Sequence, residues 1–125
     1  MDENDLASVV IGSAIEVHRS LGPGLLESAY HECLMYELGL RGLQFQSEVK
    51  VPVIYKGLKV GEAYRLDLIV EHRLIVELKA VERINDLHKA QLLTYLRLTN
   101  RKLGLLINFN NSLLKRGVHR VVNNL

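Results

Sequence analysis

Three residues whose types and spacing suit metal-assisted hydrolysis lie in the segment YRLDLIVEHRLIVELKA, Tyr64 to Ala80. Asp67 stands on one apolar run, and the sequence Glu77-Leu78-Lys79 stands on the next. The polar triplet Glu71-His72-Arg73 separates the two runs and predicts a tight antiparallel hairpin. Such a hairpin brings two carboxylates and a lysine together, and oxygen ligands of this kind bind hard divalent cations.

Alternation of side chains sets the register of this hairpin. With the polar triplet as the loop, one face becomes aliphatic and contains the pairs Val70–Leu74, Leu68–Val76 and Leu66–Leu78. The other face contains the pairs Ile69–Ile75, Asp67–Glu77 and Arg65–Lys79. A solvated strand face would also carry charged residues, but the two isoleucines on this face indicate that it is covered.

Two facing carboxylates repel each other, so we expect a cation between Asp67 and Glu77. Mg²⁺ or Mn²⁺ suits this site, because these ions take one or two carboxylates and complete their shell with water and substrate phosphate. Lys79 lies about 7 Å beyond Glu77 on the same face, by ordinary strand rise. Its ammonium group could orient or deprotonate a water molecule, or offset charge on a phosphoryl oxygen.

Asp67 and Glu77-Leu78-Lys79 resemble the metal-binding core of the PD-(D/E)XK nuclease superfamily, although Leu66 precedes the aspartate where that pattern has proline. The segment Gly24 to Tyr30, GLLESAY, is similar to the signature of its small bacterial branch, the GxxExxY proteins. Gln91 and Tyr95 have the Q-x-x-x-Y spacing of exonuclease-type members. The resemblance extends from the first helix to about Asn108.

This resemblance implies a divalent metal held by Asp67, Glu77, the carbonyl of Leu78 and Glu27. It implies catalytic roles for these carboxylates, for Lys79 and for Gln91, with Tyr30 and Tyr95 as supporting residues. The plain alternative for Glu27 is a helix-surface carboxylate, and for Tyr95 it is a core position. The superfamily includes both active nucleases and silent descendants, so the resemblance implies a fold and a latent activity.

In the first half of the chain, the spacing of apolar residues predicts two helices followed by two strands. One helix runs from Asp5 to Leu21, and a second opens with Pro23 as its first helical residue and ends near Gly39. One-turn spacing places Glu27, Tyr30 and His31 together on one side of the second helix. Residues 43–60 then predict two strands joined by a turn at Lys56-Gly57, with Pro52 marking an edge strand or a bulge.

The second half continues the alternation of helix and strand. Asn85 or Asp86 can cap a helix that ends near Asn100. Its core-facing side chains are predicted to include Leu87, Ala90, Leu93 and Leu96. Residues 102–109 have the length of a buried strand reached by a crossover, and residues 113–125 could form a short strand or a helix.

These elements predict an α/β (α+β) fold with a restriction-endonuclease-like αβββαβ core, in which helices flank a central mixed four-stranded sheet. At 125 residues the chain is expected to be one domain, residues 1–125. The single cysteine, Cys33, excludes an internal disulfide and a four-cysteine cluster. No secretory signal or membrane-length apolar run is visible, which predicts a cytoplasmic protein without a membrane partner.

Charge is distributed unevenly along the chain. Residues 1–78 contain 7 Lys/Arg against 12 Asp/Glu, whereas residues 79–125 contain 9 against 2. The basic second half is compatible with binding a phosphate backbone, and equally with simple solvation. Scattered histidines and the absence of a nucleophile elbow or a phosphate-binding loop argue against zinc, serine and nucleotide chemistry.

The preferred interpretation is a metal-dependent nuclease that hydrolyses phosphodiester bonds in DNA with Mg²⁺ or Mn²⁺. The competing interpretation is a catalytically silent nuclease-fold module that binds nucleic acid or a protein partner. A purely structural oligomer is a third. The short chain contains no separate DNA-recognition domain, which favours help from a partner or a homodimer.

Overall fold

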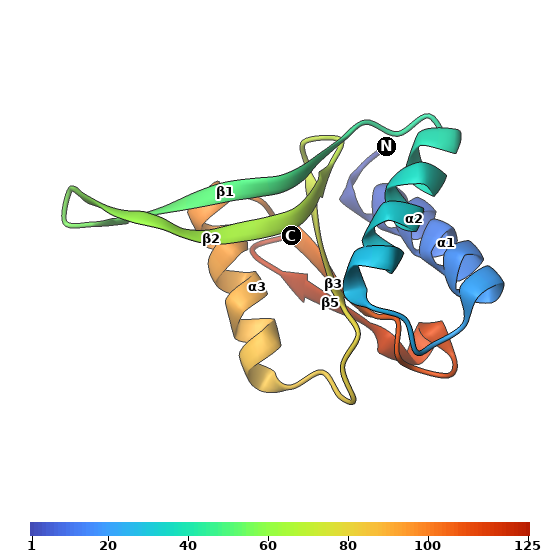
Figure 1. Ribbon diagram of the computed structural model, residues 1–125. Coiled ribbons are helices and arrows are strands. Elements are labelled where there is room, and N and C mark those ends of the chain that lie inside the picture. The colour runs from blue at the N-terminus through green and yellow to red at the C-terminus, as the bar shows by residue number, and fades with distance from the viewer.

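The computed structural model describes residues 1–61 and 64–125, and the described chain forms three α-helices and five strands (Figure 1). The helices are α1 (Glu3–Leu21), α2 (Glu27–Leu40) and α3 (Asp86–Thr99). The strands are β1 (Phe45–Tyr55), β2 (Leu58–Val70), β3 (Leu74–Lys79), β4 (Leu103–Asn108) and β5 (Val118–Val122). A 3-10 helix, η1 (Leu114–Gly117), precedes β5.

The strands form one sheet in the order β1-β2-β3-β4-β5. Only β3 and β4 run parallel, and α3 makes the crossover between them; the other neighbouring strands are antiparallel. The α/β class, the αβββαβ core and the mixed sheet flanked by helices are therefore confirmed. The sheet has five strands and not four, because residues 113–125, left open between helix and strand, form η1 and then β5.

Helices α1 and α2 lie on one face of the sheet (Figure 1). Their apolar side chains pack against the aliphatic face that contains Leu68, Val70, Leu74 and Val76. The start of α1 is a capping box, in which the Asp2 carboxylate accepts from Asp5 N and the Asp5 carboxylate accepts from Asp2 N. Among the described residues, no helix is long and apolar enough to cross a membrane.

Helix α3 covers the opposite face of the sheet. A Cβ atom on Gly104 would lie 2.8 Å from Leu92 Cδ1, so the absence of a side chain there lets α3 approach β4 closely. This contact decides which side of α3 is buried, namely the side of Leu92, Tyr95 and Leu96. The predicted core positions Leu87 and Ala90 are wrong: both are exposed, and Leu93 is half-buried. Asn85 caps the helix as predicted.

The β1–β2 hairpin is long, and its outer end extends past α3 (Figure 1). Its turn is formed by Lys56 and Gly57 with φ angles of 48° and 83°, which matches the predicted position. The prediction for Pro52 is also confirmed, since β1 is an edge strand and its register shifts between Val51 and Val53.

Both strands of this hairpin change face near Asp67. Phe45 and Val70 pack against the cluster under α1 and α2, whereas Val49 and Leu66 pack against the cluster under α3. In a regular strand, residues an even number apart would share one face. The backbone of Glu48, with φ of 52°, accommodates the change in β1.

The face change corrects two predicted pairs. Leu66 and Leu78 lie on opposite faces, so their predicted aliphatic contact is wrong. The β2–β3 ladder ends at Leu68–Val76, so the predicted Arg65–Lys79 pair is also wrong; the Arg65 guanidinium lies 3.6 Å from the Glu48 carboxylate on β1. The remaining predicted pairs of the β2–β3 hairpin, up to Leu68–Val76, are confirmed.

We predict that Gly117→Ala destabilises the protein by about 1–3 kcal/mol, the usual cost of overpacking. A methyl group there would collide with the carbonyl oxygen of Asn108 and would lie 2.7 Å from Asn111 Oδ1. Gly39→Ala is the matched control, because a Cβ at this helical position has no neighbour within 4 Å. The control should gain about 0.5–1 kcal/mol from helix propensity. Urea denaturation measures both changes, and equal stabilities would contradict the packing described at Gly117.

Candidate functional site

The backbone hydrogen-bonded ladder between β2 and β3 stops one residue short of Asp67 and Glu77. Leu68–Val76 is the last ladder pair. Beyond it, Asp67 N donates to Glu77 Oε1 at 2.9 Å, and Leu78 N donates to Asp67 Oδ2 at 2.8 Å. The two carboxylates thus accept bonds from each other's strand, in place of the missing backbone acceptors. The structure brings Asp67 and Glu77 together, as expected from the sequence, but through these interlocking bonds and not as ladder partners.

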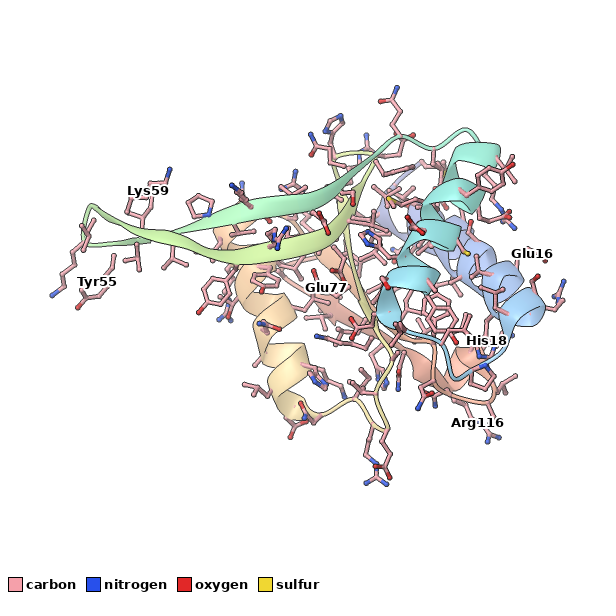
Figure 2. The ribbon with its side chains drawn as sticks, in the orientation of Figure 1. Glu16, His18, Tyr55, Lys59, Glu77 and Arg116 are labelled. Atoms are coloured by element: carbon pink, nitrogen blue, oxygen red, sulfur yellow. The ribbon has the colours of Figure 1, made fainter. Side chains whose placement is uncertain are left out.

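Glu77 is buried at the centre of the molecule, between α2 and α3 (Figure 2), with 7% of its surface exposed. Burial of its side chain and, next, the neighbouring charge of Asp67 raise its pKa from the ordinary value of 4.5 to about 8. The N–H of Asp67 and the charge of Lys79 act in the opposite direction. Near neutral pH the metal-free carboxyl pair therefore retains a proton, in the place where a cation would neutralise the same charge.

The donor set fits a hard divalent cation. Two neighbouring carboxylates, the buried Glu77 and the half-buried Asp67, match the preference of Mg²⁺ for one or two carboxylates with water at the other positions. Across the described residues, no group of three or more His, Cys, Asp and Glu side chains is close enough to hold a metal ion. The carboxylates that the structure itself assembles are therefore Asp67 and Glu77, and Glu27 is not joined to them.

Lys79 is held at the end of β3 by its backbone. Its carbonyl oxygen accepts from Phe109 N at 2.9 Å. The buried side chain of Asn108, which pairs with Lys79 in the parallel ladder, accepts from Val81 N at 3.0 Å and donates to Val81 O at 2.8 Å. Asn108 thus clamps the chain that follows Lys79. Sequence reasoning missed Asn108, although a polar residue that ends a wholly apolar strand is a usable signal.

Tyr30 of the GxxExxY segment has a structural role. Its ring stacks on Phe109 with centroids 4.5 Å apart, and its hydroxyl donates to Gly22 O at 2.6 Å and accepts from Leu25 N at 3.1 Å. These bonds hold residues 22–26 as a loop, in which Gly24 has a φ of 103°. Helix α2 therefore begins at Glu27, and the prediction that Pro23 is its first residue is wrong.

The predicted cluster of Glu27, Tyr30 and His31 is not formed as expected. Glu27 is exposed at the first position of α2, whereas Tyr30 points into the core. The imidazole of His31 lies 3.2 Å from the hydroxyl of Ser47 on β1. Because Tyr30 is buried in the core, the three side chains of this turn lie in different surroundings.

Tyr95 and Gln91 extend the site along α3. Tyr95 is buried and lies within electrostatic reach of both carboxylates: burial, and then the charge of Glu77, raises its pKa to about 12. The Tyr95 hydroxyl therefore remains protonated beside the carboxylates at any physiological pH. Gln91 lies one turn earlier, is exposed, and lines a groove between α3 and the β1–β2 hairpin.

We predict that the metal-free protein loses stability as the pH rises from about 5 to about 8. The pKa of Glu77 is higher in the folded state than its ordinary value of 4.5, so the folded state binds this proton more tightly and stability falls as the proton is lost. Each unit of pKa difference is worth about 1.4 kcal/mol. Melting temperatures in EDTA measure the effect.

Glu77→Gln should remove most of this pH dependence, because the amide oxygen can still accept from Asp67 N while the titration is lost. Glu82→Gln, at an exposed position, is the control and should retain the wild-type slope. Parallel curves for wild type and Glu77→Gln would contradict the assignment of the raised pKa to Glu77.

A family model described as PD-(D/E)XK nuclease superfamily matches residues 4–121. Comparisons with curated proteins and with solved structures found no match. The matched region contains the αβββαβ core, Asp67 and the Glu-x-Lys sequence that ends with Lys79. From the fold, the interlocked carboxylates and this match together, the chain belongs to the PD-(D/E)XK nuclease superfamily.

Proposed function

We propose that this protein is a metal-dependent nuclease that hydrolyses phosphodiester bonds in DNA. The observation that carries the proposal is the pair of interlocked carboxylates close to Lys79, the half-buried Asp67 and the buried Glu77. A buried carboxyl pair is costly unless protonated or neutralised by a cation, and strongly perturbed groups of this kind concentrate at functional sites. Superfamily membership supports a nuclease function in general terms.

Asp67 and Glu77 would hold the metal, with the carbonyl of Leu78 as a further ligand. A bound Mg²⁺ or Mn²⁺ would polarise a water molecule and neutralise charge on the scissile phosphate. Lys79 would orient the attacking water and stabilise charge on a phosphoryl oxygen. Asn108 and Phe109 hold the backbone at and after Lys79. The position from which the Lys79 side chain extends is therefore fixed.

The remaining predicted site residues would act at the margins of this centre. Glu27, exposed at the start of α2, and Gln91, exposed on α3, would complete the pocket when substrate is bound. The protonated hydroxyl of Tyr95 would serve as a hydrogen-bond donor near the carboxylates. Tyr30 would support the site indirectly, through its stack on Phe109.

DNA as the substrate is supported by the basic second half of the chain. Its exposed cations lie on α3, in the bend before β4, on η1 and on β5, and they include Lys89, Arg97, Lys102, Lys115, Arg116 and Arg120. Cations on a surface around an acidic metal site bind the phosphate backbone and direct it to the site. A second copy of the chain would add to this surface.

A silent nuclease-fold module is the second candidate, and the position of Glu27 favours it. Without that carboxylate joined to Asp67 and Glu77, the site has few protein ligands for a cation among the described residues. Such a module would bind nucleic acid or a protein partner without turnover. Salt-dependent DNA binding without cleavage would identify it.

We predict that the wild-type protein cleaves labelled single- or double-stranded DNA with Mg²⁺ or Mn²⁺ and that Lys79→Ala lowers the rate by about 100-fold or more. The substitution removes the ammonium group that assists the attacking water. Arg19→Ala, which changes an exposed cation on α1 that is not part of the basic second half of the chain, is the control and should remain within a few-fold of wild type. Equal cleavage by wild type and Lys79→Ala would refute the role of Lys79.

We predict that Mg²⁺ or Mn²⁺ raises the melting temperature of the wild-type protein. A ligand that binds only the folded state at about 100 times its Kd stabilises that state by about 2.7 kcal/mol. Asp67→Asn should abolish the increase, because the amide still accepts from Leu78 N but carries no charge. Asp86→Asn, at an exposed carboxylate in the first turn of α3, should preserve it. A metal-dependent increase that persists in Asp67→Asn would place the cation elsewhere.

A further inference from the structure

A groove with a volume of about 540 Å³ separates the β1–β2 hairpin from α3. Its size is within the usual range for sites that bind small organic groups. The hairpin contributes one wall and α3 the other, and its lining includes Val53, Val60, Tyr64, Leu87, Gln91 and Leu98. Figure 2 shows the outer end of the hairpin, with Tyr55 and Lys59, far from Glu77. The groove thus lies along the hairpin on the α3 side.

The walls of this groove are apolar although they face solvent. Leu87 is 76% exposed, and Tyr64 and Leu98 are each 41% exposed. Leu87 and Leu98 remain exposed because the contact between Leu92 and Gly104 turns a different side of α3 toward the sheet. An apolar concave surface left open in this way is typical of a binding site.

Tyr95 joins the groove to the carboxylates. Its ring lines the groove and lies 5.9 Å from the ring of Tyr64, measured between centroids. The same residue belongs to the buried cluster that contains Leu66, which is next to Asp67, and Ile75, which is two residues before Glu77 on β3. A nucleotide whose phosphate reached Asp67 and Glu77 would therefore have a neighbouring base at the mouth of the groove, next to the exposed ring of Tyr64.

The charges around the groove also suit a nucleic acid strand. Lys56 in the hairpin turn and Arg97, next to Leu98 on α3, are exposed cations on the two elements that form the groove. Exposed carboxylates on the same elements include Asp86 at the start of α3 and Glu48 on β1, whose carboxylate lies 3.6 Å from the Arg65 guanidinium. The amide of Gln91, in the groove wall, can both donate to and accept from the edge of a base.

We propose that this groove is a subsite for an unpaired nucleobase, stacked on Tyr64, and that single-stranded nucleic acid is the preferred substrate. The inference rests on the proposed nuclease function, because it takes the carboxylates as the place where the phosphate binds. A base can enter only after leaving its own stack, since both its faces are covered in a duplex. Aromatic and apolar walls accept any base, so the subsite selects strandedness and not sequence.

The test compares binding to a short single strand that contains 2-aminopurine with binding to the same strand in a duplex, both in EDTA. Tyr64→Leu keeps the groove apolar but removes the aromatic face. It should weaken single-strand binding about tenfold, leave duplex binding within about twofold, and abolish quenching of the 2-aminopurine fluorescence. Tyr36→Leu is the matched control, because Tyr36 is an exposed tyrosine on α2, outside the groove. Circular dichroism verifies that both variants are folded.

Equal loss of affinity for single strand and duplex in Tyr64→Leu, or no loss for either, would overturn the proposal. So would the result that neither form binds and Tyr64→Leu converts a dimer to a monomer, since the groove would then belong to a second copy. Because binding is measured without metal, the two proposals can fail separately. Selective binding of single strands without cleavage in Mn²⁺ would contradict the nuclease function but not the subsite. Cleavage by the wild-type protein, with a single-strand affinity that Tyr64→Leu leaves unchanged, would contradict the subsite but not the nuclease function.

Discussion

The reciprocal hydrogen bonds between Asp67 and β3 are the interaction on which the rest of the site depends. They replace two ladder bonds at the point where β2 and β3 separate, so the strands part without leaving unpaired backbone N–H groups. The same bonds hold the two carboxylates next to each other, and the burial of Glu77 together with the charge of Asp67 raises the pKa of Glu77. A local irregularity of the sheet and an unusual electrostatic site are thus one feature of this fold.

The two faces of the sheet differ in the residues they contain. The face under α1 and α2 is aliphatic, and its contacts are those of an ordinary core. The face under α3 contains Glu77 as well as apolar residues, and Tyr95 of α3 packs against it. The change of face near Asp67 makes this division possible, because it takes the β1–β2 hairpin from the first face to the second. The hairpin then forms the second wall of the groove beside α3.

Residues at the edge of the site support it at a distance. Tyr30 holds the loop before α2 and stacks on Phe109, whose N–H binds the carbonyl of Lys79. Asn108 clamps the chain two residues further on. A continuous set of contacts therefore runs from the GxxExxY segment to Lys79. Tyr30 is thereby connected to the backbone of Lys79 through Phe109.

The sequence by itself determined the β2–β3 hairpin, its register as far as Leu68–Val76, the α/β class and the proximity of Asp67 and Glu77. These features follow from local alternation of apolar residues and from turn chemistry, which act over a few residues and are legible in one strand at a time. Tertiary structure decided the face of Leu66, the exposure of Leu87, the separation of Glu27 from Tyr30 and the clamp at Asn108. Each of these depends on which surface another element presents, such as Leu92 against Gly104 or Tyr30 against Phe109. Periodicity identifies an apolar stripe, but only the packing of distant segments selects which part of it is buried.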